Sequence, residues 1–316
     1  MLLCFSGIVK HVIIPSKKKE VLPMELRVLQ YFLTAAREQS ISAAAQALHL
    51  SQPTLSRQLK EMEEELGKTL FLRGNRKITL TEEGMILRKR AQEVMELLEK
   101  AQEEIACSTE IIAGNIHIGA GETEGIRPLI QAAHSLQKQY PLVHFHIVSG
   151  DKTTVLEELD HGLIDFALIF GEIDTSRYDF LPLPAVDAFG VLMPKDAPLA
   201  QKAVIAPQDL LPYPLITSRQ MLRDDHLAHI FGNDAKNLTI AGTYNLLFNG
   251  SIMVEEGMGY AICFDNIIHI SEDSPLCFCP LSVQVSPQMQ LIWKKYQTFT
   301  KASQKFLETL RASISL

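Results

Sequence analysis

A run of short polar side chains with a guanidinium follows a turn early in the chain, and these residue types are the ones that read DNA. The set comprises Ser51, Gln52, Thr54, Ser56, Arg57 and Lys60. Arg and Gln make paired hydrogen bonds to base edges in the major groove, and hydroxyls and ammonium groups contact phosphates or bases. All six crowd the start and outer flank of one predicted helix, whose N-terminal N–H groups also favour phosphate. The spacing therefore predicts a DNA-reading surface.

A second, shorter helix must position this recognition helix. It should cover about 41–48, where four alanines leave room for another helix to cross closely. Ser51 is a suitable N-cap, and Pro53 fits the first turn, where its missing N–H costs nothing. Apolar residues then recur at spacings of four, three and four, which predicts one buried stripe. The stripe consists of Leu55, Leu59, Met62 and Leu66.

A basic hairpin is predicted directly after the recognition helix. Gly67 ends the helix, 70–72 begins a strand, Gly74 and Asn75 turn, and 77–80 returns. Cations cluster at the tip, namely Arg73, Arg76 and Lys77. A basic hairpin beside a recognition helix forms a wing that contacts backbone phosphate or the minor groove. With a helix over 24–38 that completes a three-helix core, residues 24–81 are predicted to form a winged helix-turn-helix.

Residues 24 to about 104 resemble the N-terminal region of LysR-type transcriptional regulators. The resemblance rests on a contiguous stretch from Leu29 to Gly84 that contains the double alanines, SQPTLSRQLK, the E-LG-LF-R pattern and the LT-EG end, all in family order and spacing. It implies base or phosphate contacts from Ser51, Gln52, Pro53, Thr54, Ser56 and Arg57. It also implies wing contacts from Arg73, Arg76 and Lys77.

A long helix is predicted over 82 to about 107, with Thr81 as its N-cap and Glu82 and Glu83 at its positive end. Apolar residues recur along it at alternating spacings of four and three, as in a coiled-coil seam. The seam consists of Leu87, Ala91, Val94, Leu98, Ala101 and Ile105. Packing within its own domain is the alternative, but the length of the helix and its place between domains favour pairing with a second copy. The resemblance likewise implies a dimerising linker helix here, and a tetramer built as a dimer of dimers.

After a hinge at 109–114, strands and helices alternate from residue 115 to the end of the chain. This pattern predicts an α/β domain of two mostly parallel sheets with about five strands each, forming two lobes and a cleft as the chain crosses twice. The stretches NIHIGAGETEG, LEELDHGLIDFALI and MVEEGMGYAI resemble the effector-binding domain of the same family. That domain is like a periplasmic binding protein without a secretion signal. The predicted multidomain α/β chain therefore has a head at 24–81, a linker at 82–108 and an effector-binding domain at 115–316.

Ligands of open parallel sheets bind beyond the carboxyl ends of the strands, near helix N-termini that favour anions. Hydroxyls and a guanidinium in four such loops suit a small carboxylate. The candidates are Thr123, Thr153, Ser218 and Arg219. Helix capping is the alternative role for the hydroxyls. Because Glu122 and Glu124 stand in the first loop, a cationic, amine or neutral effector stays open as well.

Composition limits the other classes of function. The net charge of the chain is −7, whereas residues 24–81 carry eight Lys and Arg against six Asp and Glu, a local net charge of +2. The contact with DNA must therefore be confined to this part of the chain. Five irregularly spaced cysteines do not form a disulfide framework, which favours the reducing cytoplasm. No apolar run is long enough for a membrane helix. Residues 1–23 are expected to be disordered or to precede a start at Met24, where members of the family usually begin.

Two further groupings offer alternatives. Cys277 and Cys279 share one side of a predicted strand. They could form a redox switch, but the sequence favours a role as small buried apolar side chains. His144 and His146 form only half of a metal site. No catalytic or cofactor-binding motif is present, so we predict neither an enzyme nor a bound cofactor or metal. The prediction is a LysR-type regulator that binds double-stranded DNA, a small-molecule effector and itself. The alternative is a cytoplasmic small-molecule-binding or redox-sensing α/β protein with a non-functional head.

Overall fold

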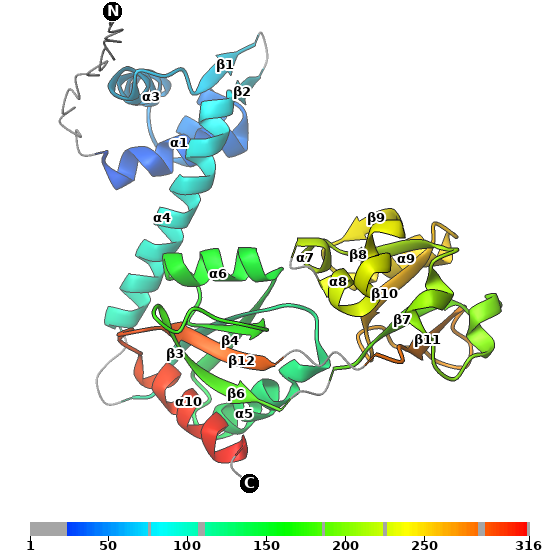
Figure 1. Cartoon of the computed structure of the whole chain (residues 1–316). Helices are drawn as coiled ribbons and strands as arrows, with labels where there is room; N and C mark the ends of the chain where they lie inside the picture. Colours follow the sequence, from blue (N-terminus) through cyan, green and yellow to red (C-terminus); the bar gives the residue numbers. More distant parts are fainter. Residues whose placement is uncertain are drawn as a thin grey trace, which may run out of the picture. The chain divides into compact units, whose positions relative to one another are not determined.

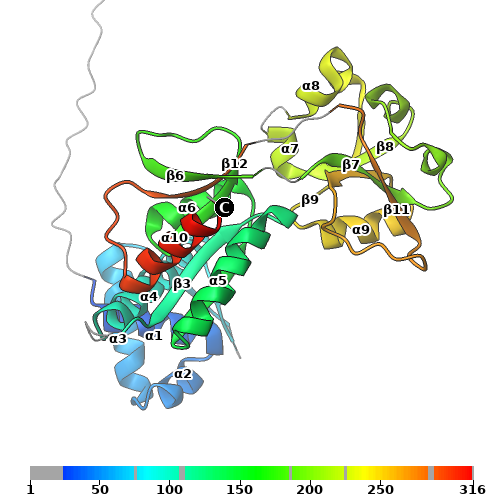
Figure 2. The same cartoon turned by 90° about the horizontal axis from the view of Figure 1, so that it is seen from below.

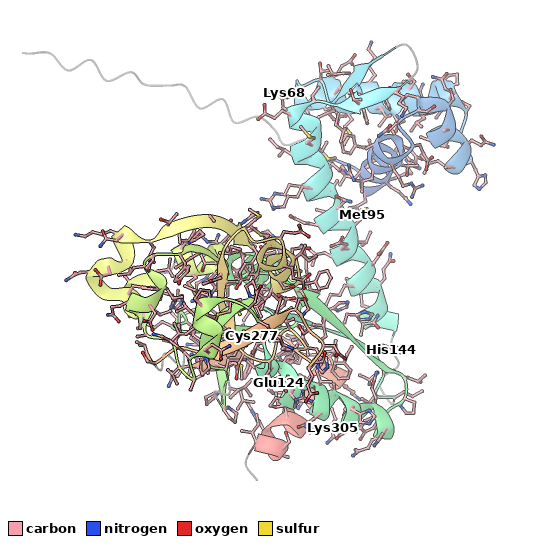
Figure 3. The ribbon with its side chains drawn as sticks, turned by 90° about the vertical axis from the view of Figure 1, so that its right-hand side faces the viewer. Lys68, Met95, Glu124, His144, Cys277 and Lys305 are labelled. Carbon is pink, nitrogen blue, oxygen red and sulfur yellow. The ribbon has the colours of Figure 1, made fainter. Side chains whose placement is uncertain are left out.

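The computed structural model describes residues 24–74, 77–106, 111–184, 187–223, 226–283 and 288–314. The chain divides into two compact units between Met95, labelled in Figure 3, and Glu96. Helix α4 (Glu82–Ala106) therefore belongs in part to each unit. Each unit has its own hydrophobic core. Among the described helices, none combines the length and the apolar composition that crossing a bilayer requires.

The first unit is a winged helix-turn-helix, here called the head. Its elements are α1 (Leu26–Glu38), α2 (Ile41–Ala47), α3 (Gln52–Leu66), the antiparallel wing strands β1 (Phe71–Arg73) and β2 (Ile78–Leu80), and the first half of α4. The side chains of Phe32 and Leu55 are fully buried at its centre. Leu26 at the start of α1 is 42% exposed, because the buried face of α1 runs through Leu29, Phe32 and Ala35.

The second unit contains two five-stranded sheets, as predicted. The sheet of lobe I has the order β4-β3-β5-β12-β6 and that of lobe II the order β11-β7-β10-β8-β9. The lobe I strands are β3 (Gly114–Ala120), β4 (Val143–Ser149), β5 (Phe166–Phe170), β6 (Tyr178–Leu183) and β12 (Met289–Lys294). The lobe II strands are β7 (Phe189–Pro194), β8 (Pro214–Ser218), β9 (Thr239–Tyr244), β10 (Tyr260–Phe264) and β11 (Leu276–Pro280). The chain enters lobe II after β6 and returns to lobe I before β12 (Figure 1).

The prediction of mostly parallel sheets was wrong, since each sheet is mixed. In lobe I the pairs β3–β4 and β3–β5 are parallel, while β12 runs antiparallel to β5 and β6. In lobe II, β8 pairs in parallel with β9 and β10, while β7 runs antiparallel to β10 and β11. Strand β6 was not predicted at all. It contains Pro182, which a sheet tolerates on an edge strand such as this one.

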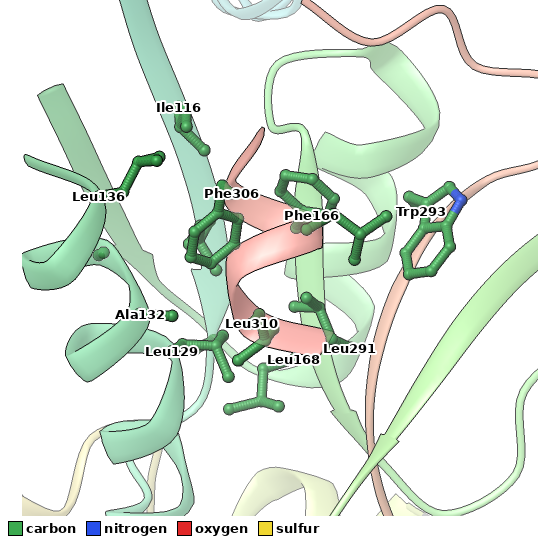
Figure 4. Close-up of a cluster of buried hydrophobic side chains, with 14 of the residues drawn as sticks. Ile116, Leu129, Ala132, Leu136, Phe166, Leu168, Leu291, Trp293, Phe306 and Leu310 are labelled. Carbon is green, nitrogen blue, oxygen red and sulfur yellow. The ribbon is translucent and has the colours of Figure 1, made fainter. Parts of the chain in front are cut away.

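Helices cover these sheets. Lobe I carries α5 (Arg127–Gln139), α6 (Lys152–His161) and α10 (Lys301–Ile314), and Figure 2 shows α5 and α10 side by side. Between them and the sheet lies the core of Figure 4, where Phe166 meets Phe306 edge-on with ring centroids 5.5 Å apart. Phe166 also stacks on Phe299 at 5.2 Å. Lobe II carries α7 (Arg219–Arg223), α8 (His226–Phe231) and α9 (Leu247–Glu255).

Candidate functional site

The start of α3 presents the polar residues that the sequence assigned to DNA. Ser51 caps the helix, because its Oγ accepts the backbone N–H of Thr54 at 3.3 Å and lies 2.7 Å from the Thr54 hydroxyl. Gln52, Pro53 and Thr54 are exposed beside it, whereas Ser56 is half-buried. The structure therefore brings these side chains together on one accessible helix start.

Two cations continue this surface along α3. Arg57 Nε lies 3.8 Å from Glu61 Oε1, and Lys60 Nζ lies 3.2 Å from Glu64 Oε1, both one turn further on. All four side chains are largely exposed. Exposed pairs of this kind contribute only about 0–1 kcal/mol, so a phosphate can replace the carboxylate at little cost.

The wing is fixed to the recognition helix by Glu63, a residue that sequence reasoning missed. Its Oε1 accepts the backbone N–H groups of Leu70 at 2.6 Å and Phe71 at 3.0 Å. The two bonds join residues seven and eight positions apart in different elements, and no periodic pattern in the sequence indicates them. Of the predicted wing contacts, Arg73 is the last residue of β1, Lys77 is exposed just before β2, and Arg76 lies outside the described residues.

The predicted dimerisation seam on α4 is not one exposed stripe. Ala91 is buried in the head and Leu87 packs against the same core, so both are already used within the chain. Leu98 is half-buried, while Val94, Ala101 and Ile105 are exposed, Ile105 at 84%. The second half of the seam is therefore the part available to another copy.

A cleft lies between lobe I and lobe II. It encloses about 100 Å³. Three phenylalanines supply an apolar wall, since the ring of Phe264 lies 5.1 Å from that of Phe170 and 4.4 Å from that of Phe189. Polar lining comes from Glu122, Asp151, Ser218, Arg219, Gln220, His226 and Asn245. This mixture suits a small ligand with an apolar body and one polar end.

Only two of the four predicted effector residues line this cleft. Ser218 and Arg219 do, although the Ser218 hydroxyl also accepts the backbone N–H of Met221 at 3.1 Å. Thr123 is buried apart from the lining and donates to Asp187 Oδ2 at 2.6 Å. Thr153 lines a different hollow of lobe I, beside α6. For these two residues the contacts in the structure are those of helix starts rather than of the cleft.

The carboxylates of the cleft are already bonded within the protein. Glu122, in lobe I, accepts the backbone N–H of Leu247 at the start of α9 in lobe II, where the N-cap residue Leu246 has no capping side chain. Asp151 Oδ2 lies 2.5 Å from Arg223 Nη2, again across the lobes. Burial acts to raise the pKa of Asp151, but hydrogen bonds from Thr154 and Arg223 outweigh burial and hold that pKa below its ordinary value. No local pattern in the sequence signals these two pairs, whose partners lie 125 and 72 positions apart.

The groupings considered for redox and metal chemistry have ordinary structural contacts. Cys279 donates to Lys202 O at 2.9 Å, and burial raises the pKa of both Cys277 and Cys279, which disfavours the reactive thiolate. His146 stacks on His117 at 4.7 Å, on the strand next to its own. Within the described ranges no three His, Cys, Asp or Glu side chains are grouped as a metal site.

Replacing Cys277 and Cys279 with Ser, singly and together, is therefore expected to leave DNA binding and its response to hydrogen peroxide unchanged. The raised thiol pKa values make both sulfurs poor nucleophiles toward an oxidant. Gel shifts with and without peroxide check this. A peroxide effect that disappears in either variant would establish the redox alternative.

Comparison with protein families agrees with the geometry of both units. Residues 26–85 match "Bacterial regulatory helix-turn-helix protein, lysR family", and residues 110–315 match "LysR substrate binding domain". The fold is also that of CbnR, a LysR family regulator solved in complex with its target DNA. That structure has a TM-score of 0.71 at 18% identity and covers 92% of this chain and all of CbnR.

Relatives at higher identity are regulators as well. HTH-type transcriptional regulator BsdA of Bacillus subtilis is 36% identical over 170 residues, which are 54% of this chain and 58% of BsdA. The matched part thus spans little more than half of that relative. A probable RuBisCO transcriptional regulator of Porphyra purpurea is 28% identical over 246 residues, 76% of this chain and 78% of that protein. The family matches to the helix-turn-helix and to the substrate-binding domain, in this order and over most of the chain, show that this protein belongs to the LysR family of transcriptional regulators.

Proposed function

We propose that this protein is a regulator, not an enzyme, whose head binds duplex DNA, whose α4 pairs with another copy, and whose two-lobe domain binds a small effector. The proposed division places the head at 24–81, the linker at 82–108, the hinge at 109–114 and the effector-binding domain at 115–316. We further propose a cytoplasmic location, since that is where such a regulator would meet the DNA that it binds.

The observation that carries the DNA-binding proposal is the exposed, capped start of α3. Gln52, Thr54 and Arg57 stand on one accessible flank there, on a helical pair small enough to enter a major groove. Lys60 and the wing cations Arg73, Arg76 and Lys77 extend the contact to the phosphates. Retention of duplex DNA in a gel shift, weakening steeply with salt, tests this proposal.

Pairing of two copies would let two heads bind one DNA site together. One helix-turn-helix contacts only a short half-site, and a symmetric pair reads two of them. The exposed Val94, Ala101 and Ile105 with the half-buried Leu98 offer an apolar strip on α4 for a dimer, and a tetramer would pair two dimers. The exposed Met85 and Ile86, at 58% and 61%, add apolar surface at the start of the same helix.

The effector we propose is a small anion with an apolar body. Glu122 and Glu124 argued against an anion, but Glu124 pairs with Arg127 and is not part of the cleft lining. The carboxylates that do line the cleft, Glu122 and Asp151, are each bonded to a group of lobe II. Arg219 also lines this cleft, and it forms no ion pair with another of the described residues. A carboxylate on Arg219 beside the phenylalanine wall fits this distribution of charge.

Arg219→Gln is expected to abolish most of the stabilisation by such a ligand. The stabilisation is measured as the thermal shift that a panel of aliphatic and aromatic monocarboxylates produces, in comparison with amines of the same size. A ligand at a hundred times its Kd stabilises by about 2.7 kcal/mol, and losing a charged hydrogen bond removes about 1.5–3 kcal/mol of binding. Arg127→Gln is the control, because Arg127 is exposed and pairs with Glu124 away from the cleft lining. Stabilisation by amines instead of carboxylates would contradict an anionic effector.

A further inference from the structure

One end of helix α6 is held by the opposite lobe at the edge of the cleft. Its N-cap Asp151 lines the cleft and pairs with Arg223 at 2.5 Å. The next backbone N–H, that of Lys152, donates to Gln220 Oε1 at 3.4 Å. Both partners lie on α7 of lobe II, and Gln220 lines the cleft too. A ligand in the cleft therefore touches the residues that bond the start of α6 to lobe II.

The other end of α6 is bonded to the linker helix. Gly162, the left-handed C-cap of α6 with φ of 78°, offers its carbonyl oxygen to Lys100 Nζ of α4 at 3.2 Å. The same ammonium lies 2.9 Å from Asp165 Oδ1, in a pair whose side chains are only 16% and 6% exposed. Asp165 Oδ2 accepts the backbone N–H of His117 at 2.8 Å. The end of α6 and the start of β5 thus hold the last turns of α4 through a buried charge.

Between these ends α6 is tightly packed against the sheet of lobe I. Val155 and Leu159 on its inner face are fully buried in one cluster with Ile164. The helix lies so close to β3 that a Cβ on Gly119 would sit 2.7 Å from Val155 Cγ1 and 2.6 Å from Ile164 Cδ1. At about 1.5 Å per residue its ten residues span roughly 15 Å. Close-packed elements shift as bodies rather than deform, so a displacement at one end reaches the other.

We propose that α6 couples the cleft to the linker helix, through the α6–α7 contacts at one end and the Lys100–Asp165 pair at the other. This inference rests on the proposed function, since it assigns the route by which an effector would alter α4. Figure 1 shows the helix running from α7 toward the lower part of α4. Lys100 and Asp165 are positioning residues in this scheme and touch neither effector nor DNA.

The test perturbs one end of α6 and observes the other by amide hydrogen exchange in the full-length protein. Arg223→Ala removes the cross-cleft pair and should accelerate exchange at 97–102 of α4 at least about fivefold. Gln220→Ala, which removes the second contact, should act in the same direction. Arg127→Ala removes an exposed ion pair with Glu124 in lobe I that does not involve α6, and it should leave exchange at 97–102 unchanged.

Coupling is reciprocal, so Lys100→Met should accelerate exchange at 219–223 of α7 in turn. Changes confined to the mutated end in both Arg223→Ala and Gln220→Ala would overturn the proposal, whether or not the Lys100 variant folds. DNA binding by gel shift separates the two proposals. A protein that binds DNA without this exchange coupling contradicts only the role of α6, and one that shows the coupling without binding DNA contradicts only the proposed function.

Discussion

Replacing Asp165 with Asn is expected to destabilise lobe I by about 3–5 kcal/mol, because it leaves the Lys100 ammonium, only 16% exposed, without its counter-charge. The sole tryptophan, Trp293, is buried in β12 of lobe I, so its fluorescence follows the unfolding of that lobe in urea. Asp209→Asn is the control. It removes a carboxylate from the more exposed pair with Lys202 and should hardly move the transition.

The same carboxylate predicts a pH dependence with a definite sign. Burial acts to raise the pKa of Asp165, but neighbouring His117 and the Lys100 charge outweigh burial and hold that pKa below its ordinary value. Its stabilising contribution is therefore fully present above about pH 4, the ordinary pKa of Asp, and is lost as pH falls through the lowered value. The Asn variant should lack this acid-side decline. A variant with wild-type stability at pH 7 would mean that the pair contributes little.

Leu55→Ala is expected to unfold the head selectively. The Leu55 side chain is fully buried between the helices of the head, and truncating such a leucine costs about 2–5 kcal/mol. Circular dichroism should show loss of helix at a lower urea concentration, together with loss of DNA binding. The Trp293 transition should stay in place, because the head has its own core.

Leu26→Ala serves as the matched control, since Leu26 is a leucine of the same unit, on α1, but is 42% exposed. It should change the stability of the head only slightly. A Trp293 transition that moves with Leu55→Ala would show that the two units unfold together rather than independently.

The elements that the sequence predicted well are those with local signals. Ser51 and Pro53 mark the start of α3, and Gly67 marks its end, all within the span of one helix. Family order in the same stretch implies which residues contact DNA, and that assignment stays a prediction. Strand β6 escaped prediction because Pro182 interrupts its pattern, and only its place at the sheet edge makes that proline acceptable.

Contacts between residues far apart in the chain could not be predicted from the sequence. Lys100 looks like any other charged residue of α4 until the fold brings it to Asp165, 65 positions away. Glu122 suggested repulsion of an anion, whereas its carboxylate caps α9 in the other lobe. The candidate effector residues were chosen by loop position and by side-chain chemistry, and neither says which hydroxyl points into the cleft. This is why Ser218 reaches the cleft and Thr153 does not.

The central claim is that α3 reads DNA, and the most direct measurement is a gel shift with DNA upstream of the protein's own gene. Arg57→Ala and Arg37→Ala form a matched pair, since both guanidinium side chains are 71% exposed and both pair with a glutamate. We expect sharp retention by the wild type and by Arg37→Ala. Arg57→Ala should lose about 1–3 kcal/mol, roughly five- to 150-fold in affinity. Equal binding by all three proteins, or equal loss in both variants, would contradict the assignment of α3 as the recognition helix.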